Sequence, residues 1–127
     1  MPNRPHIYTA QAAAIPVPDD NPIAVVVLGG ISSEYPNQVI KFNGWANFTP
    51  DVAATDVVLD IFKDAGLSQS IEFVQIALTA GAAGNVSIYA ELPVGEVSAA
   101  QYWLAISFVS ALGASTVHFA QLTARID

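Results

Sequence analysis

The 127-residue chain contains no cysteine and few charged side chains. Without cysteine it can form no disulfide framework, no thiolate metal site and no cysteine nucleophile. Charged residues make up 12% of the sequence, about half of the ~25% share that is usual in soluble domains. Because a monomer of this size needs a polar surface, this deficit, together with 53% apolar residues, favours an oligomer or an assembly.

Basic residues are the scarcest charged class. Arg4, Lys41, Lys63 and Arg125 stand against eleven acids, which gives a formal net charge of −7. So few cations cannot form a basic patch, and we therefore expect no nucleic-acid partner and no binding to an anionic membrane surface. We also expect no membrane insertion and no signal peptide, because no apolar run approaches about eighteen residues and the opening residues lack the signal pattern.

Motifs of catalysis, cofactor binding and metal binding are missing as well. His6 and His118 are too few for a histidine metal cage. Asp56, Asp60 and Asp64 follow one another at intervals that separate neighbours by ~13 Å along a strand, beyond the ~5–9.5 Å of a glycosidase carboxylate pair. We therefore expect no enzyme activity, no cofactor and no metal.

Alternation of apolar and polar side chains with a period of two runs through most of the chain and indicates β-strands. The clearest case is the segment 56–64, in which Val57, Leu59 and Ile61 alternate with the three aspartates. The continuous apolar run at 23–28 predicts a strand buried on both faces. Similar patterns, separated by glycine and proline, predict further strands at 38–49, 71–78, 85–92, 101–109 and 116–126.

Two irregularities are expected within these strands. Gly44 stands in the middle of its strand, and a glycine there indicates a bulge or a close backbone approach. In the last strand, Val117 and Phe119 are out of step with the apolar residues that follow. We therefore expect a bulge near Ala120 or Gln121.

Residues 1–22 differ from the rest because prolines interrupt a weakly patterned stretch. Proline cannot donate to a sheet ladder, so we predict an extended N-terminal arm that contains at most one edge strand. This arm is a connector between subunits or an edge strand of its own sheet. The remainder, 23–127, is predicted to form a single β-sandwich domain.

The number and spacing of the expected strands indicate the fold class. About eight short strands at roughly ten-residue spacing predict an all-β, antiparallel β-sandwich of jelly-roll type. An immunoglobulin-type sandwich is the alternative, although its Cys…Trp…Cys spacing is missing.

Large apolar side chains at the expected outward positions are candidates for an interface. Trp45, Trp103 and Phe62 are such residues, and protein interfaces are enriched in aromatic side chains. The same aromatics could instead form a sugar-binding platform, but their aliphatic neighbours favour packing between proteins. The candidate interface set is Ile7, Tyr8, Ile15, Trp45, Val58, Phe62, Val74, Ile76 and Trp103.

Several segments resemble small bacterial jelly-roll proteins of the C1q/TNF-like, spore-surface or spore-appendage type. They are the Pro-rich arm, VIKFNGWANFTP, DVVLDIFKDAG and STVHFAQLTARID, the last with the triplet Leu122-Thr123-Ala124. The resemblance spans most of 22–127 and implies trimeric or fibrous assembly at a cell, spore or virion surface. In spore-appendage subunits an N-terminal arm docks on the neighbouring subunit and cysteines staple the contact, whereas this chain has an arm but no cysteine.

The sequence thus leaves two functions open. The first is a structural, self-assembling subunit of a fibre, a shell or a trimeric surface protein, with the chain itself as partner. It would be joined through apolar sheet faces and the N-terminal arm. The alternative is a lectin-like module that binds carbohydrate through exposed aromatic residues.

Overall fold

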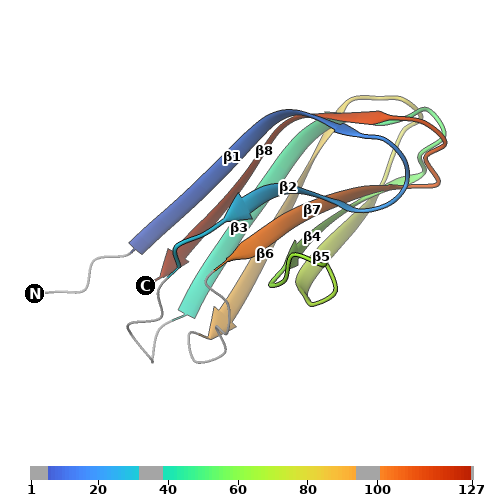
Figure 1. The fold of residues 1–127 in the computed structure, drawn as a ribbon. Helices are drawn as coiled ribbons and strands as arrows, with labels where there is room; N and C mark the ends of the chain where they lie inside the picture. The colour runs from blue at the N-terminus through green and yellow to red at the C-terminus, as the bar shows by residue number, and fades with distance from the viewer. Residues whose placement is uncertain (1–5, 32–38, 94–100, 127) are drawn as a thin grey trace, which may run out of the picture.

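The computed structural model describes residues 6–31, 39–93 and 101–126, which form β-strands and connecting turns (Figure 1). The strands are β1 (His6–Val17), β2 (Ile23–Leu28), β3 (Val39–Thr49), β4 (Asp56–Phe62), β5 (Ser70–Ala77), β6 (Gly84–Pro93), β7 (Tyr102–Val109) and β8 (Ser115–Ile126). Within these described ranges no helix is long and apolar enough to cross a membrane. The first residues of the predicted arm, 1–5, lie outside the described residues.

The strands form two four-stranded antiparallel sheets that pack face to face (Figure 1). The first sheet has the order β1-β8-β3-β6 and the second has the order β2-β7-β4-β5. Consecutive strands lie in opposite sheets, except for the pair β4 and β5, so most connections cross between the sheets. This is the arrangement of a jelly roll, and the predicted all-β, antiparallel sandwich is confirmed.

The inner faces of the two sheets build one hydrophobic core. Two aromatic contacts connect β3 to β7 across the sandwich, with ring centroids 4.7 Å apart for Phe42 and Tyr102 and 5.3 Å apart for Phe48 and Phe108. All four side chains are at most 1% exposed. Such tilted aromatic pairs add to the burial of apolar area that holds the sheets together.

Gly44 of β3 is closely surrounded by side chains of β6 and β7. A Cβ at this position would lie 2.9 Å from Ile88 Cγ2 and 3.0 Å from Leu104 Cδ1. The pairing of β3 with β6 and β8 shows no register shift at Gly44. Neither predicted reason therefore applies to Gly44: the sheet has no bulge there, and the atoms that leave no room for a Cβ belong to side chains rather than to the backbone.

Strand β8 contains a bulge, but not where the sequence predicts it. Its pairing with β3 shifts in register at His118, which is the extra residue. Phe119 consequently faces outward, where its ring centroid lies 5.1 Å from that of Trp45. The predicted position near Ala120 or Gln121 is wrong because it assumed that an apolar phenylalanine must face the core.

Most of the predicted arm is part of the sandwich. Residues His6–Val17 pair with β8 in continuous antiparallel register, from His6 opposite Ile126 to Val17 opposite Ser115. The arm thus provides the edge strand that was one of its two predicted roles (Figure 1). Its other predicted role, as a connector between subunits, remains a prediction.

Candidate functional site on the outer sheet faces

The outer face of the first sheet is available to a partner and is here called the polar face. Residues that lie directly opposite each other in antiparallel strands share a face, so the strand register assigns every side chain. The polar face carries Ile7, Thr9, Gln11, Ala13, Pro16, Val39, Lys41, Asn43, Trp45, Asn47, Thr49, Asn85, Ser87, Tyr89, Glu91, Thr116, Phe119, Gln121, Thr123 and Arg125.

Uncharged hydroxyl and amide groups are connected across β1 and β8 on this face. Thr9 Oγ1 and Thr123 Oγ1 are 3.4 Å apart, and Gln11 Nε2 donates to Gln121 Oε1 at 3.4 Å. Gln121 Nε2 also donates to Thr123 Oγ1 at 3.2 Å. These groups therefore form a polar ladder, of the kind that stabilises cross-strand pairs at a solvated surface.

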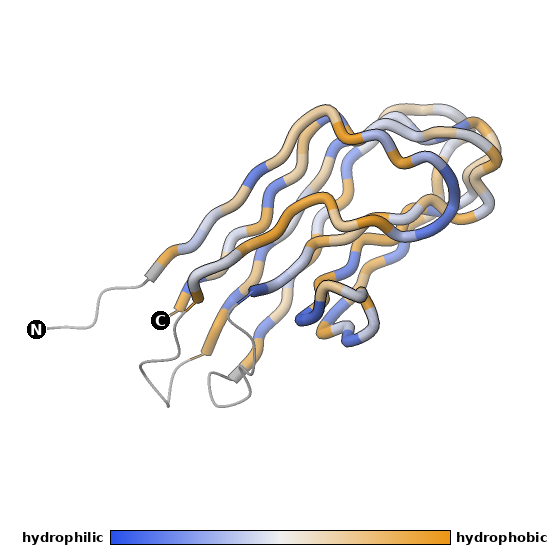
Figure 2. Tube along the Cα trace, viewed as in Figure 1, coloured by the Kyte–Doolittle hydropathy of each residue, from blue (hydrophilic) through white to orange (hydrophobic). Residues whose placement is uncertain are grey.

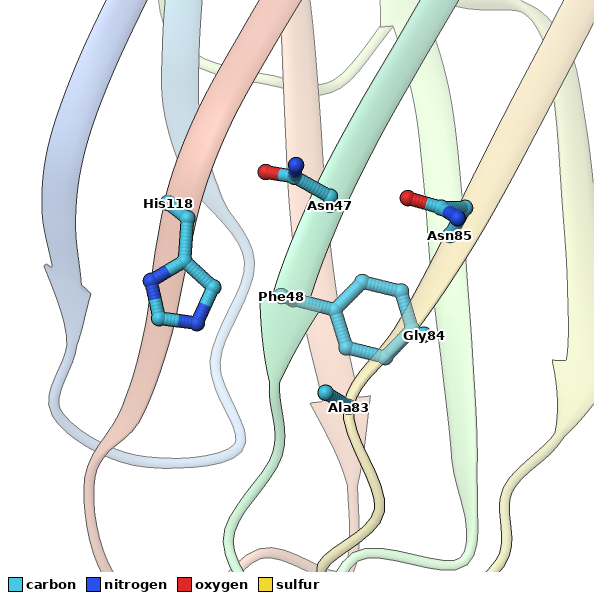
Figure 3. A pocket seen from close by; sticks show the side chains of 6 residues that line it. All are labelled: Asn47, Phe48, Ala83, Gly84, Asn85 and His118. Carbon is cyan, nitrogen blue, oxygen red and sulfur yellow. The ribbon is translucent and has the colours of Figure 1, made fainter.

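A shallow hollow of about 250 Å³ lies at one end of the polar face (Figure 3). It is lined by Asn47, Phe48, Ala83, Gly84, Asn85 and His118. His118 Nε2 lies 2.8 Å from Thr49 Oγ1, and Asn47 Oδ1 is buried without a hydrogen-bond partner among the described residues. Two amides and an imidazole supply donors and acceptors but no carboxylate, which suits a neutral hydroxylated molecule.

The outer face of the second sheet differs in composition and is here called the apolar face. The same register argument assigns its side chains. It carries Ala24, Val27, Asp56, Val58, Asp60, Phe62, Ser70, Phe73, Gln75, Ala77, Trp103, Ala105, Ser107 and Val109. Along the chain trace, the residues of β2 at one edge of this sheet are hydrophobic over most of the strand (Figure 2).

Large apolar side chains on the apolar face are exposed to solvent. Phe73 is 58% exposed and Val27 is 47% exposed, and Trp103, directly opposite Val27, is partly exposed. Phe73 lies opposite Asp60, which in turn lies opposite Ala105. Val27 and Phe73 thus lie on the two edge strands of the sheet, β2 and β5, and are candidates for contact with a partner.

The two acids on the apolar face have hydrogen-bond partners within the same subunit. Ser70 Oγ donates to Asp60 Oδ1 at 2.5 Å, and Gln75 Nε2 donates to Asp56 Oδ2 at 2.5 Å. Burial raises the pKa of Asp60 above its ordinary value, and the hydrogen bond from Ser70 only partly opposes that shift. A partner could therefore cover this face without leaving these carboxylates unpaired.

The predicted interface residues do not form one surface. Ile7 and Trp45 lie on the polar face, whereas Val58, Phe62 and Trp103 lie on the apolar face. Phe62 faces outward as predicted, but it is only 7% exposed because its neighbours cover it. It therefore contributes little to a contact surface.

The other predicted interface residues lie on the inner side of the sandwich. Val74 and Ile76 pair with buried residues of β4, so their predicted outward orientation is wrong. Ile76 is still 38% exposed because β5 is an edge strand. Tyr8 and Ile15, on β1, are partly buried and pack against the core.

Two exposed residues of the apolar face were missed by the sequence analysis. Strand β2 was predicted to be buried on both faces, which is wrong for Val27 because β2 is the edge strand of its sheet. Phe73 lies in a strand with apolar residues at both parities, so alternation gave no signal for its direction. Its outward position follows only from its pairing with Asp60.

No arrangement suited to metal chemistry occurs in the described part of the chain. There, no three or more His, Cys, Asp or Glu side chains come close enough together to hold a metal ion. His118 is exposed and contacts Thr49 rather than a carboxylate. The expectation that the protein is not an enzyme stays a prediction.

Comparison with known proteins identifies a shared fold. No protein family matches the sequence, and no curated protein sequence is similar to it. A chain of the T13 viral particle of infectious bursal disease virus (IBDV) matches with a TM-score of 0.65 at 13% identity, over 96% of this chain and 31% of the viral chain. Dimeric latent PorU from Porphyromonas gingivalis matches with a TM-score of 0.56 at 8% identity, over 97% of this chain and 13% of PorU.

These matches are limited in what they show. The chain spans about a third of the viral protein's length and less of PorU. At such identities the likeness shows the fold, a jelly-roll sandwich. A protein of the Bacillus endospore appendages, described as disulfide-linked pili, matches at 12% identity over 89% of its length, but its TM-score of 0.45 carries no argument. The matches do not support the specific C1q/TNF-like resemblance.

Proposed function

We propose that this chain is a structural subunit that self-assembles by packing its apolar face against a second copy. The observation that carries the proposal is the exposure of Val27, which lies beside Trp103, and of Phe73 on β5 of the same face. Protein interfaces concentrate aromatic side chains and exclude charged ones from their centre. Val58 and Trp103, which belong to the predicted interface set, lie on this face as well.

The chemistry of the apolar face supports its being covered. Asp56 and Asp60 accept hydrogen bonds from Gln75 and Ser70 of the same subunit. Buried polar groups are costly only when they lack partners. The remaining side chains of the face are mainly aliphatic, aromatic or small.

The composition and the fold support a second copy as the occupant. The apolar face carries only Asp56 and Asp60 as charged residues, and both accept hydrogen bonds within their own subunit, so this face offers little with which to recognise a charged partner. A jelly roll of the same shape is part of the IBDV viral particle. This supports a shell-like or fibre-like assembly for a chain with this fold.

Charge opposes this association and provides a way to tune it. Asp56 and Asp60 of two copies would approach each other across the interface, in a chain that is already acidic. Salt shortens the range of their repulsion to a Debye length of about 8 Å at physiological strength. We therefore expect association to strengthen from low to moderate salt. We expect it to strengthen again in mild acid, above pH 3.8, where Asp60 already takes up a proton because its pKa is raised.

Sedimentation velocity over a concentration series tests the proposal. The wild type should associate, and Phe73→Ser and Val27→Ser should each raise the dissociation constant at least about tenfold, which corresponds to about 1.4 kcal/mol. Tyr89→Ser is the matched control, because Tyr89 is 50% exposed on the polar face. A wild type that stays monomeric, or equal losses for Phe73→Ser and Tyr89→Ser, would contradict the proposed interface.

Carbohydrate binding at the polar face is a second candidate function. Trp45 is 37% exposed on the same face as the hollow lined by Asn47, Asn85 and His118. An aromatic ring beside neutral donors and acceptors is chemistry that can hold a sugar. A glycan array with the wild type and with His118→Ala tests it: a signal that the variant loses while its sedimentation is unchanged supports binding, and no signal contradicts it.

A further inference from the structure

We propose that strand β1 pairs with β1 of a second copy, antiparallel and in a register centred on Ala10, so that two first sheets join into one continuous sheet. The inference rests on the proposed function in one respect, because both require self-association. It assigns a second contact that is separate from the apolar face. The partner is another copy of this chain, bound through backbone hydrogen bonds.

Strand β1 is a long edge strand whose outward backbone groups are available to pair with another strand. It is the outermost strand of the first sheet and has β8 as its neighbour (Figure 1). It extends over 12 residues and pairs with β8 in continuous register. Every second residue of such an edge turns its N–H and C=O away from the sheet, and this unpaired row is a template for another strand.

The other sheet edges carry protecting features that the segment 7–13 of β1 lacks. Strand β2 is 6 residues long and has a register irregularity between Ala24 and Val26. Short length and irregularity each make an edge strand less able to pair with another chain. Strand β5 carries Glu72, and β6 carries Glu91 and ends at Pro93. Strand β1 has no Asp, Glu, Lys or Arg in the whole of its sequence, HIYTAQAAAIPV.

Two irregular residues of β1 determine the register of the proposed pairing. Ala14 has a φ of 55°, which interrupts the regular strand, and Pro16 lacks an N–H. The regular uncharged part of β1 is therefore 7–13, and an antiparallel pair that uses all of it has its two-fold axis at Ala10. In that register Ile7 lies opposite Ala13, Tyr8 opposite Ala12 and Thr9 opposite Gln11 of the other copy.

The side chains fit this pairing on the outer side of the sheet. Thr9 and Gln11 already belong to the polar ladder with β8. Pairing Thr9 with Gln11 of the second copy continues that ladder across the axis. Ile7, which is 62% exposed, would lie beside Ala13 of the second copy, whose own neighbour on β8 is Phe119.

Charge supports a second copy rather than a different chain. Residues close to a two-fold axis approach their own equivalents, so a charged residue there would repel itself. In a chain with eleven acids, the β1 edge is a stretch of 12 residues without one. A neutral, self-complementary edge can thus approach its own copy without opposing like charges.

A single-cysteine series tests the pairing, because the chain has no cysteine of its own. Ala10→Cys should form an intermolecular disulfide under mild oxidation, since opposed antiparallel residues have Cα atoms about 4.5–5.5 Å apart, within the range of disulfides. A cysteine at Thr9 or Gln11 would lie diagonally across from the same residue of the second copy, at about 7–8 Å. The Thr9→Cys and Gln11→Cys variants should therefore form little disulfide. Ser87→Cys, on the opposite edge strand β6, is the control.

A charge exchange provides a second readout that does not depend on disulfide geometry. Thr9→Lys/Gln11→Lys places lysines opposite lysines, and Thr9→Glu/Gln11→Glu places acids opposite acids, so each variant alone should associate at least about tenfold more weakly. Mixing the two variants should restore association. Both positions are exposed, so folding should change little.

The outcomes separate this inference from the proposed function. A disulfide yield at Ala10 several-fold above those at Thr9, Gln11 and Ser87, with rescue on mixing, is the expected result. A maximum at Thr9 or Gln11, or no yield above the control, overturns the pairing. If Phe73→Ser dissociates the oligomer and the lysine variant does not, the β1 pairing is contradicted, whereas the proposed apolar-face contact is not. A wild type that is monomeric throughout contradicts both proposals.

Discussion

The two outer faces of this sandwich belong to sheets of equal strand number but differ in their polar side chains. On the polar face, Thr9, Gln11, Gln121 and Thr123 form a hydrogen-bonded ladder. On the apolar face, the corresponding exposed surface includes Phe73. The difference supports the proposal that the second sheet, rather than the first, packs against a partner.

Charge follows the same division. Lys41 lies opposite both Arg125 and Glu91 in one row of the polar face, so bases and an acid neighbour each other there. The apolar face carries acids alone, Asp56 and Asp60, and each accepts a hydrogen bond from its own subunit. The outer face of the first sheet thus mixes both signs of charge, whereas that of the second carries only acids, each with a hydrogen-bond partner in its own subunit.

The largest expected losses of stability come from core residues on the inner faces of the two sheets. The two inner faces should contribute similarly to stability, although the outer faces differ. Leu59→Ala in the second sheet and Leu122→Ala in the first remove side chains that are 0% exposed. Each should lower the free energy of unfolding by about 2–5 kcal/mol, measured by urea denaturation of dilute protein. A loss confined to one sheet would mean that the core is not shared as described.

A smaller effect of opposite sign is expected at Tyr102. Its hydroxyl is buried without a hydrogen-bond partner among the described residues, and burial raises its pKa to about 12. Tyr102→Phe removes an unpaired polar group and keeps the ring contact with Phe42, so it should stabilise the fold by about 1 kcal/mol. Urea denaturation measures this; a clear destabilisation would show that the hydroxyl has a partner.

The smallest effect is expected at Asp60 of the apolar face. Because the pKa of Asp60 is raised in the folded protein, its protonated form stabilises the fold fully below pH 3.8, and this contribution is lost as the pH rises through the raised pKa. Asparagine resembles the protonated form, so Asp60→Asn should raise stability at pH 7, by less than about 1 kcal/mol because the group is partly exposed. Thermal unfolding of dilute protein at pH 7 and pH 4 measures the difference, which should shrink in acid.

Asp64→Asn is a control for Asp60→Asn, because the opposite change in stability is expected. Hydrogen bonds from the Ser68 side chain and from the backbone of Ser68 and Gln69 lower the pKa of Asp64. Its contribution to stability is therefore present above pH 3.8 and lost as the pH falls through the lowered pKa. Asp64→Asn should accordingly destabilise the fold at pH 7. If both variants changed stability in the same direction, the different environments described for the two carboxylates would be wrong.

The fold could be predicted well from the sequence because the physical signal was local. Alternation along β4 correctly placed Val57, Leu59 and Ile61 in the core, and the strand count indicated the sandwich. The bulge was predicted at the wrong position because the outward orientation of Phe119 depends on a contact with another strand. Phe119 turns outward to pack on Trp45, a residue of another strand that the sequence of β8 does not reveal.

The candidate site was predicted less well, because it depends on which strands become edges. Val27 is exposed since β2 has a neighbour on one side only, and that is a property of the sheet order. Val74 and Ile76 were assigned to the wrong side because β5 is apolar at both parities, so only the register with β4 decides their direction. Sequence patterns could therefore name the aromatic and aliphatic candidates but not sort them between the two faces.

The central claim is that the apolar face, and not the polar face, becomes buried when the chain associates. Hydroxyl-radical footprinting with mass spectrometry tests it within one molecule, because Phe73 and Tyr89 are aromatic residues of similar exposure, 58% and 50%, on the two faces. On going from dilute to concentrated protein, oxidation of Phe73 should fall several-fold while that of Tyr89 stays nearly constant. Protection of Tyr89 with Phe73 still reactive, or no change at either residue, would contradict the account.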